Sequence, residues 1–173
     1  MTGTLFPVSA ADVAITGDDW YTPHWLFEAA GLVFDMDVCA PVMPESRTCP
    51  ARRYLTVVED GLDVPWEGLV WMNPPYSKTK MWVAKWITHP DGLALLPAAQ
   101  GSKGYSSTAT LVGSSDAIAL LAGGLEFYKV EGATSLFYAV ILAARGEVAS
   151  AALARIAARW STPAWKRNLE QFP

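Results

Sequence analysis

The stretch VWMNPPYSK, residues 70–78, runs from three apolar residues through an asparagine into two adjacent prolines and a tyrosine. The apolar residues predict the end of a short buried strand. Pro74 and Pro75 each fix φ at about −65° and lack an N–H donor, so the segment after the strand is a stiff loop that presents carbonyl oxygens. Ligands of open α/β sheets bind just beyond the carboxyl ends of strands, and this loop is therefore a candidate functional site.

Two side chains of this loop add chemistry to its carbonyl groups. Asn73 supplies a further oxygen acceptor, and Tyr76 supplies a flat aromatic face. Two convergent acceptors beside a ring suit a planar amine. The same four residues also fit a strand end that is braced by prolines and packed on a buried tyrosine, so the tetrapeptide alone leaves both interpretations open.

The composition indicates a single globular domain. The 173 residues are 51% hydrophobic and 17% charged, unlike a disordered chain. The formal charge of −4 gives no overall sign of a nucleic-acid-binding protein, so contact with a polyanion would depend on local basic residues. Cys39 and Cys49 are too few for a disulfide framework and lack zinc-ligand spacing, so we expect reduced thiols and no metal site.

Hydropathy along the chain argues against a membrane protein. No apolar run approaches the roughly 20 residues of a membrane span. The first residues lack the basic region that is typical of a signal peptide. We therefore expect a cytoplasmic protein with no membrane contact.

The first half of the chain predicts alternating helices and strands. Thr22 is a candidate N-cap, Pro23 suits the first helical position, and Gly31 suits the helix end. Apolar patterns then predict strands over residues 32–40, 53–58 and 68–72, with a proline-rich loop over residues 41–53, and tryptophans spaced four apart predict a helix over residues 78–89.

The second half begins with a continuous apolar run over residues 92–98, which is typical of a strand covered on both faces. A flexible segment, a helix around Ala109 to Leu121, two strands and an alanine-rich helix are expected in turn, the last three over residues 125–130, 135–144 and 146–160. This order predicts an α/β sandwich whose mostly parallel sheet has an antiparallel edge. We expect an N-terminal arm over residues 1–18, one domain over 19–160 and a C-terminal tail over 161–173.

Asn-Pro-Pro-Tyr resembles the catalytic signature of S-adenosylmethionine-dependent amino methyltransferases. Together with DDWYTPHWLF, FDMDVCAP, CPARRYLTVVEDGL and PWEGLVWMNPPYS, in this order, it resembles the small bacteriophage-type (Dam-like) DNA N6-adenine methyltransferases. The resemblance runs from Asp18 to Leu96 and extends more weakly to the later strands. It implies a Rossmann-like methyltransferase fold, S-adenosylmethionine as cofactor, methyl transfer to the N6 amine of adenine in DNA, and action in a bacterial host cell if a phage or prophage encodes the protein.

The resemblance also implies roles for the residues of the tetrapeptide. The Asn73 side chain and the Pro74 carbonyl would accept hydrogen bonds from the adenine amine. Pro75 would stiffen the loop, and Tyr76 would stack on the base after it flips out of the duplex. Two acceptors pulling on the amine hydrogens favour a nitrogen that can attack a sulfonium methyl group directly, without a metal.

The same resemblance implies a set of cofactor-binding residues. The expected cofactor residues are Tyr21, Thr22, Pro23, Asp37, Cys39, Ala40 and Asp60. Among these, a carboxylate at Asp37 would accept from the methionine ammonium, and Asp60 would meet the adenine amine or the ribose. Ordinary explanations stay open: a loop-capping role for Asp37, a helix cap for Thr22 and a solvated turn for Asp60.

Two features depart from the family pattern. Ala40-Pro41 stands where many methyltransferases carry glycines that allow close backbone approach to the cofactor. The segment between Asp37 and Asn73 is also short, which predicts that one strand and helix of a complete core are trimmed. The segment LPAAQGSKGYSS also lacks the arginine and aromatic residues that the family pattern predicts after the strand near Leu96. This departure concerns DNA binding more than methyl transfer.

Binding to DNA needs local positive charge. The expected DNA-binding residues are Arg52, Arg53, Lys78 and Lys80. The chain leaves no room for a separate recognition domain, so sequence preference would come from loops or from a second subunit, with a homodimer as the simplest arrangement. Alternatives are a methyltransferase that acts on an RNA base amine or on a protein glutamine, and a non-catalytic nucleic-acid-binding protein on the same scaffold.

Overall fold

The computed structural model describes residues 21–98, 101–128 and 134–160. The expected N-terminal arm and C-terminal tail lie outside the described residues. Within the described part of the chain, no helix is long and apolar enough to cross a membrane.

A single six-stranded sheet organises the domain, in the order β2-β1-β3-β4-β6-β5. Strands β1 to β4 pair in parallel, whereas β6 runs antiparallel to β4 and β5 runs antiparallel to β6. The predicted mostly parallel sheet with an antiparallel edge is therefore confirmed. The strands are β1 (Phe34–Asp37), β2 (Ala51–Tyr54), β3 (Val70–Met72), β4 (Gly92–Pro97), β5 (Ala117–Tyr128) and β6 (Thr134–Arg145).

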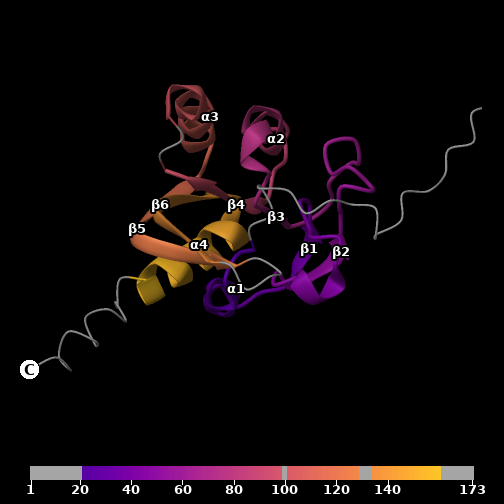
Figure 1. The fold of residues 1–173 in the computed structure, drawn as a ribbon, viewed down its shortest axis with the longest axis horizontal. Coiled ribbons are helices and arrows are strands. Elements are labelled where there is room, and N and C mark those ends of the chain that lie inside the picture. Colours follow the sequence, from indigo (N-terminus) through magenta and orange to yellow (C-terminus); the bar gives the residue numbers. More distant parts are fainter. Residues whose placement is uncertain (1–20, 99–100, 129–133, 161–173) are drawn as a thin grey trace, which may run out of the picture.

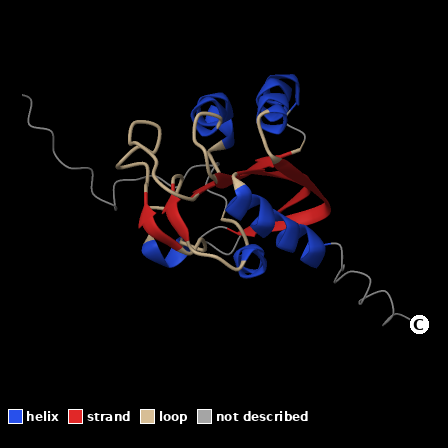
Figure 2. Cartoon of the chain, turned by 180° about the vertical axis from the view of Figure 1, so that it is seen from behind, coloured by secondary structure: helices blue, strands red, loops and turns tan. Residues whose placement is uncertain are grey.

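Helices cover both faces of this sheet, α2 and α3 on one side and α1 and α4 on the other (Figure 1). The view from behind shows the same layers, with strands between two sets of helices (Figure 2). This is a Rossmann-like α/β sandwich. The helices are α1 (His24–Ala30), α2 (Thr79–Trp86), α3 (Gly101–Gly113) and α4 (Glu147–Trp160), with short 3-10 helices at Pro44–Ser46 and Tyr76–Lys78.

The alternation of apolar side chains along β3 and β4 divides the core into two clusters. Trp71 packs with residues of α1 and α4, whereas Val70 and Met72 pack with Trp82 and Trp86 of α2. Every residue of β4 is buried, as expected for a parallel strand with helices on both faces. Burial of both faces fixes the register, because a slip by one residue would move every side chain to the wrong cluster.

The order in which the strands are added to the sheet reverses between β1 and β3. From β1 the chain moves outward to β2, then returns past β1 to β3 and continues to β4 on the other side. Open α/β sheets bind ligands where the strand order reverses in this way, at the carboxyl ends of the two central strands. In this protein those strands are β1, which ends at Asp37, and β3, which is followed directly by Asn73.

The first helix differs from its prediction at the start and agrees at the end. Its N-cap is Pro23, with no side-chain cap bond, and Thr22 lies one residue further out. The prediction that Thr22 caps this helix is therefore wrong, because its hydroxyl is engaged by Asn73 instead. Gly31 ends the helix at φ 63°, a left-handed conformation that favours glycine.

The third helix lies earlier in the chain than predicted. It spans Gly101–Gly113, and residues from Ala117 onward form β5. The expected helix around Ala109 to Leu121 is therefore wrong in its second half. The apolar run at the start of β5 pairs residue by residue with β6, for example Ala119 with Leu142, and this long-range pairing overrides the local pattern.

Candidate active site

A pocket lies at the carboxyl ends of β1 and β3. Its lining includes Asp37, Cys39 and Ala40 after β1, Asn73 and Pro75 after β3, and Tyr21 and Thr22 before α1. Seven residues expected at the site thus share one cavity, although they come from three separate segments of the chain. The remaining lining residues are Pro41, Thr48, Cys49 and Trp71.

Asn73 is held by side chains on both sides of its amide group. Its Nδ2 donates to the Thr22 hydroxyl at 3.3 Å, and the Tyr76 hydroxyl donates to its Oδ1 at 3.4 Å. Thr22 is only 3% exposed, so the first contact is shielded from water. The bond to Thr22 orients the amide nitrogen toward the α1 side and thereby turns the carbonyl oxygen toward Tyr76.

The prolines and the next turn fix the loop that carries Asn73. Pro74 is buried, and the Pro75 carbonyl accepts from the Lys78 N–H at 3.0 Å. The Thr79 hydroxyl donates to the Tyr76 carbonyl at 2.8 Å. These bonds form the 3-10 turn that leads into α2, so the tetrapeptide is tied to β3 at one end and to a helix at the other.

Asp37 is the buried charge of the pocket. It is 4% exposed, and its Oδ1 accepts from the Cys39 N–H at 3.1 Å. Burial raises the pKa of Asp37 to about 7, although the Cys39 N–H and the charge of Arg47 act in the opposite direction. A carboxyl group in this state gains from a cationic ligand, which would supply the missing counter-charge.

A loop after β1 closes the cavity wall. Arg47 donates to the carbonyl groups of Pro41 and Val42, both at 3.2 Å, and its guanidinium lies 4.6 Å from the ring centroid of Tyr54. Burial raises the pKa of both Cys39 and Cys49, and for Cys39 the charges of Asp37 and Asp60 add to the effect. Both thiols therefore stay protonated and act as small apolar wall groups.

Two of the expected cofactor residues do not line the cavity. Pro23 is buried behind Thr22 at the start of α1. Asp60 is exposed in a turn, at φ 50°, where its Oδ1 accepts from the Leu62 N–H at 3.0 Å. Aspartate commonly accepts such a bond within a turn. The negative charge of Asp60 nevertheless contributes to the raised pKa of Cys39 in the pocket wall.

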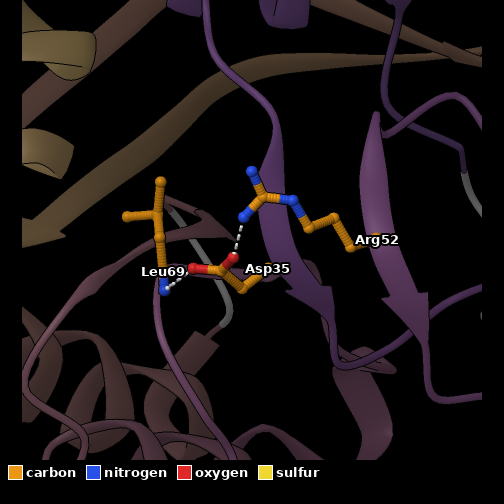
Figure 3. Close-up of polar contacts among 3 residues, drawn as sticks. All are labelled: Asp35, Arg52 and Leu69. Atoms are coloured by element: carbon orange, nitrogen blue, oxygen red, sulfur yellow. Dashed lines mark hydrogen bonds and ion pairs between the residues drawn. The ribbon is translucent and has the colours of Figure 1, made fainter.

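The expected DNA-binding residues fall into two groups. Lys78 and Lys80 are exposed beside Tyr76, at the pocket edge of the sheet. Arg52 and Arg53 lie in β2 and not in the expected loop, because residues 51–54 pair in register with β1. Arg52 forms an ion pair with Asp35, which also accepts from the Leu69 N–H at 2.8 Å (Figure 3).

This ion pair lies toward the amino ends of the strands. Asp35 comes before Asp37 in β1, and Leu69 directly precedes β3. The Leu69 N–H and the Arg52 guanidinium lower the pKa of Asp35, so the pair is charged at neutral pH. Arg52 is consequently directed away from the pocket, whereas the Arg53 side chain is exposed.

The sequence does not predict four of the lining residues, for three different reasons. Trp71 belongs to a predicted strand, and only the register that pairs it with Asp37 in the structure places it at the pocket. Pro41 was considered only as a departure from a glycine-rich loop, and Thr48 and Cys49 lie in an irregular loop that carries no periodic signal. Within the described residues, no group of three or more metal-binding side chains comes together.

Comparisons with known proteins identify the family of this chain. The family model described as "DNA N-6-adenine-methyltransferase (Dam)" matches residues 11–135, a range that includes part of the expected arm. A DNA N-6-adenine-methyltransferase of Haemophilus phage HP1 is 33% identical over 76 residues, which cover 41% of this chain and 42% of that protein. The chain thus spans less than half the length of this relative. Because the family model covers most of the chain, the protein belongs to the DNA N-6-adenine-methyltransferase (Dam) family.

Proposed function

We propose that this protein transfers a methyl group from S-adenosylmethionine to the N6 amine of adenine in DNA. The observation that carries the proposal is the meeting of Asp37 and Asn73 in one pocket, at the point where the strand order of the sheet reverses. The carboxyl group of Asp37 suits a cationic cofactor, and the side-chain oxygen of Asn73 suits an amine. Membership of the family supports the same activity.

The residues around Asp37 fit the methionine end of S-adenosylmethionine. A buried carboxylate whose pKa is raised to about 7 lacks a full counter-charge, and an ammonium group would provide it. The neighbouring lining residues Tyr21, Thr22, Cys39 and Ala40 would form the walls around this end of the cofactor. When bound, the cofactor supplies an electrophilic methyl group on a sulfonium centre.

The tetrapeptide would hold the target amine. The Asn73 carbonyl oxygen and the Pro74 carbonyl would accept its two hydrogens, and the bond from Asn73 to Thr22 would hold the amide oxygen toward the incoming base. The Tyr76 hydroxyl, which donates to that acceptor at 3.4 Å, would give way as the base enters. The Tyr76 ring would then stack on the flipped adenine.

Contacts with DNA would depend on few cations. Lys78 and Lys80 flank the tetrapeptide and are exposed, so they would meet phosphates beside the flipped nucleotide. Arg53 would add to these contacts, and Arg52 would contribute less because Asp35 already balances its charge. A homodimer would bring a second set of these cations to the same DNA.

The test is an assay of labelled methyl transfer from S-adenosylmethionine to DNA, RNA and protein in parallel. We expect label on adenine in DNA, lost in Asn73→Ala and kept in Asn168→Ala, which changes the other asparagine of the chain. Label found only on RNA or on protein would assign the same amine chemistry to a different substrate. If calorimetric titration with S-adenosylmethionine shows no heat of binding, and no substrate is labelled, the protein would be a non-catalytic member of the family.

A further inference from the structure

Lys85 of α2 makes an unusual set of contacts for a surface lysine. Its Nζ donates to the carbonyl groups of Gly61, Leu62 and Val64 at 3.0, 2.7 and 2.6 Å. An ammonium group has three donors, and here all of them bind the main chain of one turn. Among the described residues, no carboxylate lies within ion-pair distance of Lys85.

Aromatic side chains reinforce the same connection. The indole N–H of Trp66 donates to the Gly61 carbonyl at 2.7 Å, and its ring stacks on Trp82 of α2 with centroids 6.2 Å apart. The Lys85 ammonium also lies 5.0 Å from the centroid of the Trp66 ring. Two side chains therefore converge on Gly61, and both tie the turn to α2.

The turn in question extends from Asp60 to Val64. The Asp60 carbonyl accepts from the N–H groups of Asp63 and Val64 at 2.9 and 3.2 Å. Polar groups inside the turn thus hold its shape, whereas the contacts of Lys85 and Trp66 hold its position. A turn without a periodic apolar pattern depends on such polar contacts to stay in place.

Gly61 brings this turn against the cofactor end of the sheet. A Cβ atom at Gly61 would lie 2.1 Å from the Val38 carbonyl oxygen, so the glycine backbone packs directly on the residue between Asp37 and Cys39. Both of those residues line the pocket. The turn therefore supports the wall of the pocket from behind.

We infer that Lys85 is a positioning residue for the cofactor pocket: it holds the turn Asp60–Val64 against the carboxyl end of β1 and thereby fixes the wall formed by residues 37–40. The inference rests on the proposed use of S-adenosylmethionine. Lys85 touches neither the base nor the cofactor in this arrangement, so its loss should weaken cofactor binding and leave the methyl-transfer step unchanged.

The test compares Lys85→Met, which keeps the length of the apolar stem and removes all three donors, with the wild-type protein. The dissociation constant for S-adenosylmethionine should rise at least about tenfold, because bonds to a charged group are lost, while kcat at saturating cofactor stays nearly the same. Hydrogen exchange at the N–H groups of Leu62, Asp63 and Val64 should become faster. Lys85→Arg, which keeps a cation and donors, should recover part of both effects.

Arg159→Met is the matched control, because it removes one cation from α4, on the other face of the sheet, where Arg159 pairs with Glu28. It should change neither cofactor affinity nor exchange in the turn. If Lys85→Met does not fold, Trp66→Phe keeps an aromatic ring, removes the indole N–H bond to Gly61 and reduces the ring contacts with Trp82 and Lys85, so it should produce a smaller change in the same direction.

The outcomes separate this inference from the proposed function. Unchanged cofactor affinity in Lys85→Met, or a fall in kcat with unchanged affinity, would overturn the inference alone. A wild-type protein that binds no S-adenosylmethionine would overturn the proposed function and the inference with it.

Discussion

Replacing the buried carboxyl group of Asp37 with an amide should make the ligand-free protein more stable at alkaline pH. Asp37 is 4% exposed and accepts the Cys39 N–H. Its pKa is raised from 3.8 to about 7, chiefly by burial. Asp37→Asn keeps the size of the side chain and a carbonyl acceptor for the Cys39 N–H, and it removes the charge.

The sign of the effect follows from proton linkage. Between pH 4 and pH 7 the unfolded chain releases the Asp37 proton while the folded protein keeps it, so the free energy of unfolding falls by about 1.4 kcal/mol per pH unit. Above pH 7 both states are ionised and the loss levels off. The interval from 3.8 to about 7 corresponds to a total of about 4 kcal/mol, as an upper bound because water can enter around the charge.

The assay is urea unfolding of both proteins from pH 4 to pH 8 without cofactor. The two proteins should have similar stability near pH 4, and the variant should become progressively more stable above it. Other groups with shifted pKa values, such as Asp35, Glu59 and Asp91, remain in both proteins, so they cancel in the difference. Parallel stability curves for the two proteins would refute the argument that Asp37 is a desolvated acid.

Ionisation of Asp37 should also make cofactor binding depend on pH. Here the charge is favourable, whereas it destabilises the ligand-free protein. Binding of a cation requires the ionised carboxylate, so the apparent dissociation constant for S-adenosylmethionine should rise about tenfold per pH unit below pH 7 and stay constant above it. Asp37→Asn should bind the cofactor weakly at every pH. A pH-independent affinity in the wild-type protein would contradict the role of Asp37 as counter-charge.

The remaining predictions concern the base and the DNA. Asn73→Ala should lower kcat roughly 10²- to 10³-fold with little change in cofactor affinity; single-turnover methylation measures it, and a wild-type rate would remove Asn73 from the mechanism. Tyr76→Phe should have a mild effect on affinity for a flipped base, whereas Tyr76→Ala should lose roughly 1–3 kcal/mol of it. Titration with DNA that carries an abasic site opposite the target adenine measures both, and equal losses in the two variants would show that the hydroxyl matters more than the ring. DNA affinity should fall steeply with salt, and Lys78→Ala or Lys80→Ala should reduce the salt slope by about one, whereas Arg52→Ala should reduce it less; identical slopes in all variants would place the phosphate contacts elsewhere.

Periodic patterns in the sequence predicted much of the central sheet. The strands that contain Asp37 and Val70, and the continuous apolar run of β4, all form as expected. The position of Asn73 just past a strand end followed from the same pattern. These elements are buried on one or both faces, so their residue types are set by packing and leave a readable periodicity.

Contacts between distant segments could not be predicted in the same way. Thr22 and Asn73 are 51 residues apart, and nothing in either segment indicates that their side chains meet. Arg52 has the sequence context of a loop but pairs in β2, since the register with β1 decides its conformation. Lys85 likewise has the spacing of an exposed helix position, and only the fold shows that a turn lies against it.

The segment after β1 lacks a glycine-rich loop and carries the buried carboxyl group of Asp37. In dinucleotide-binding proteins of this fold type, glycine-rich loops bind phosphate groups through free main-chain N–H donors. Here the N–H of Val38 donates to Trp71, that of Cys39 to Asp37 and that of Ala40 to Leu55, and Pro41 has none. Residues 38–41 therefore offer the cavity no main-chain donor for an anion. They surround the buried carboxyl group of Asp37, so this end of the pocket would favour a cationic group over the diphosphate of a dinucleotide. Under the proposed function, the charged amino acid end of S-adenosylmethionine would therefore lie after β1, next to the loop after β3 that would bind the amine.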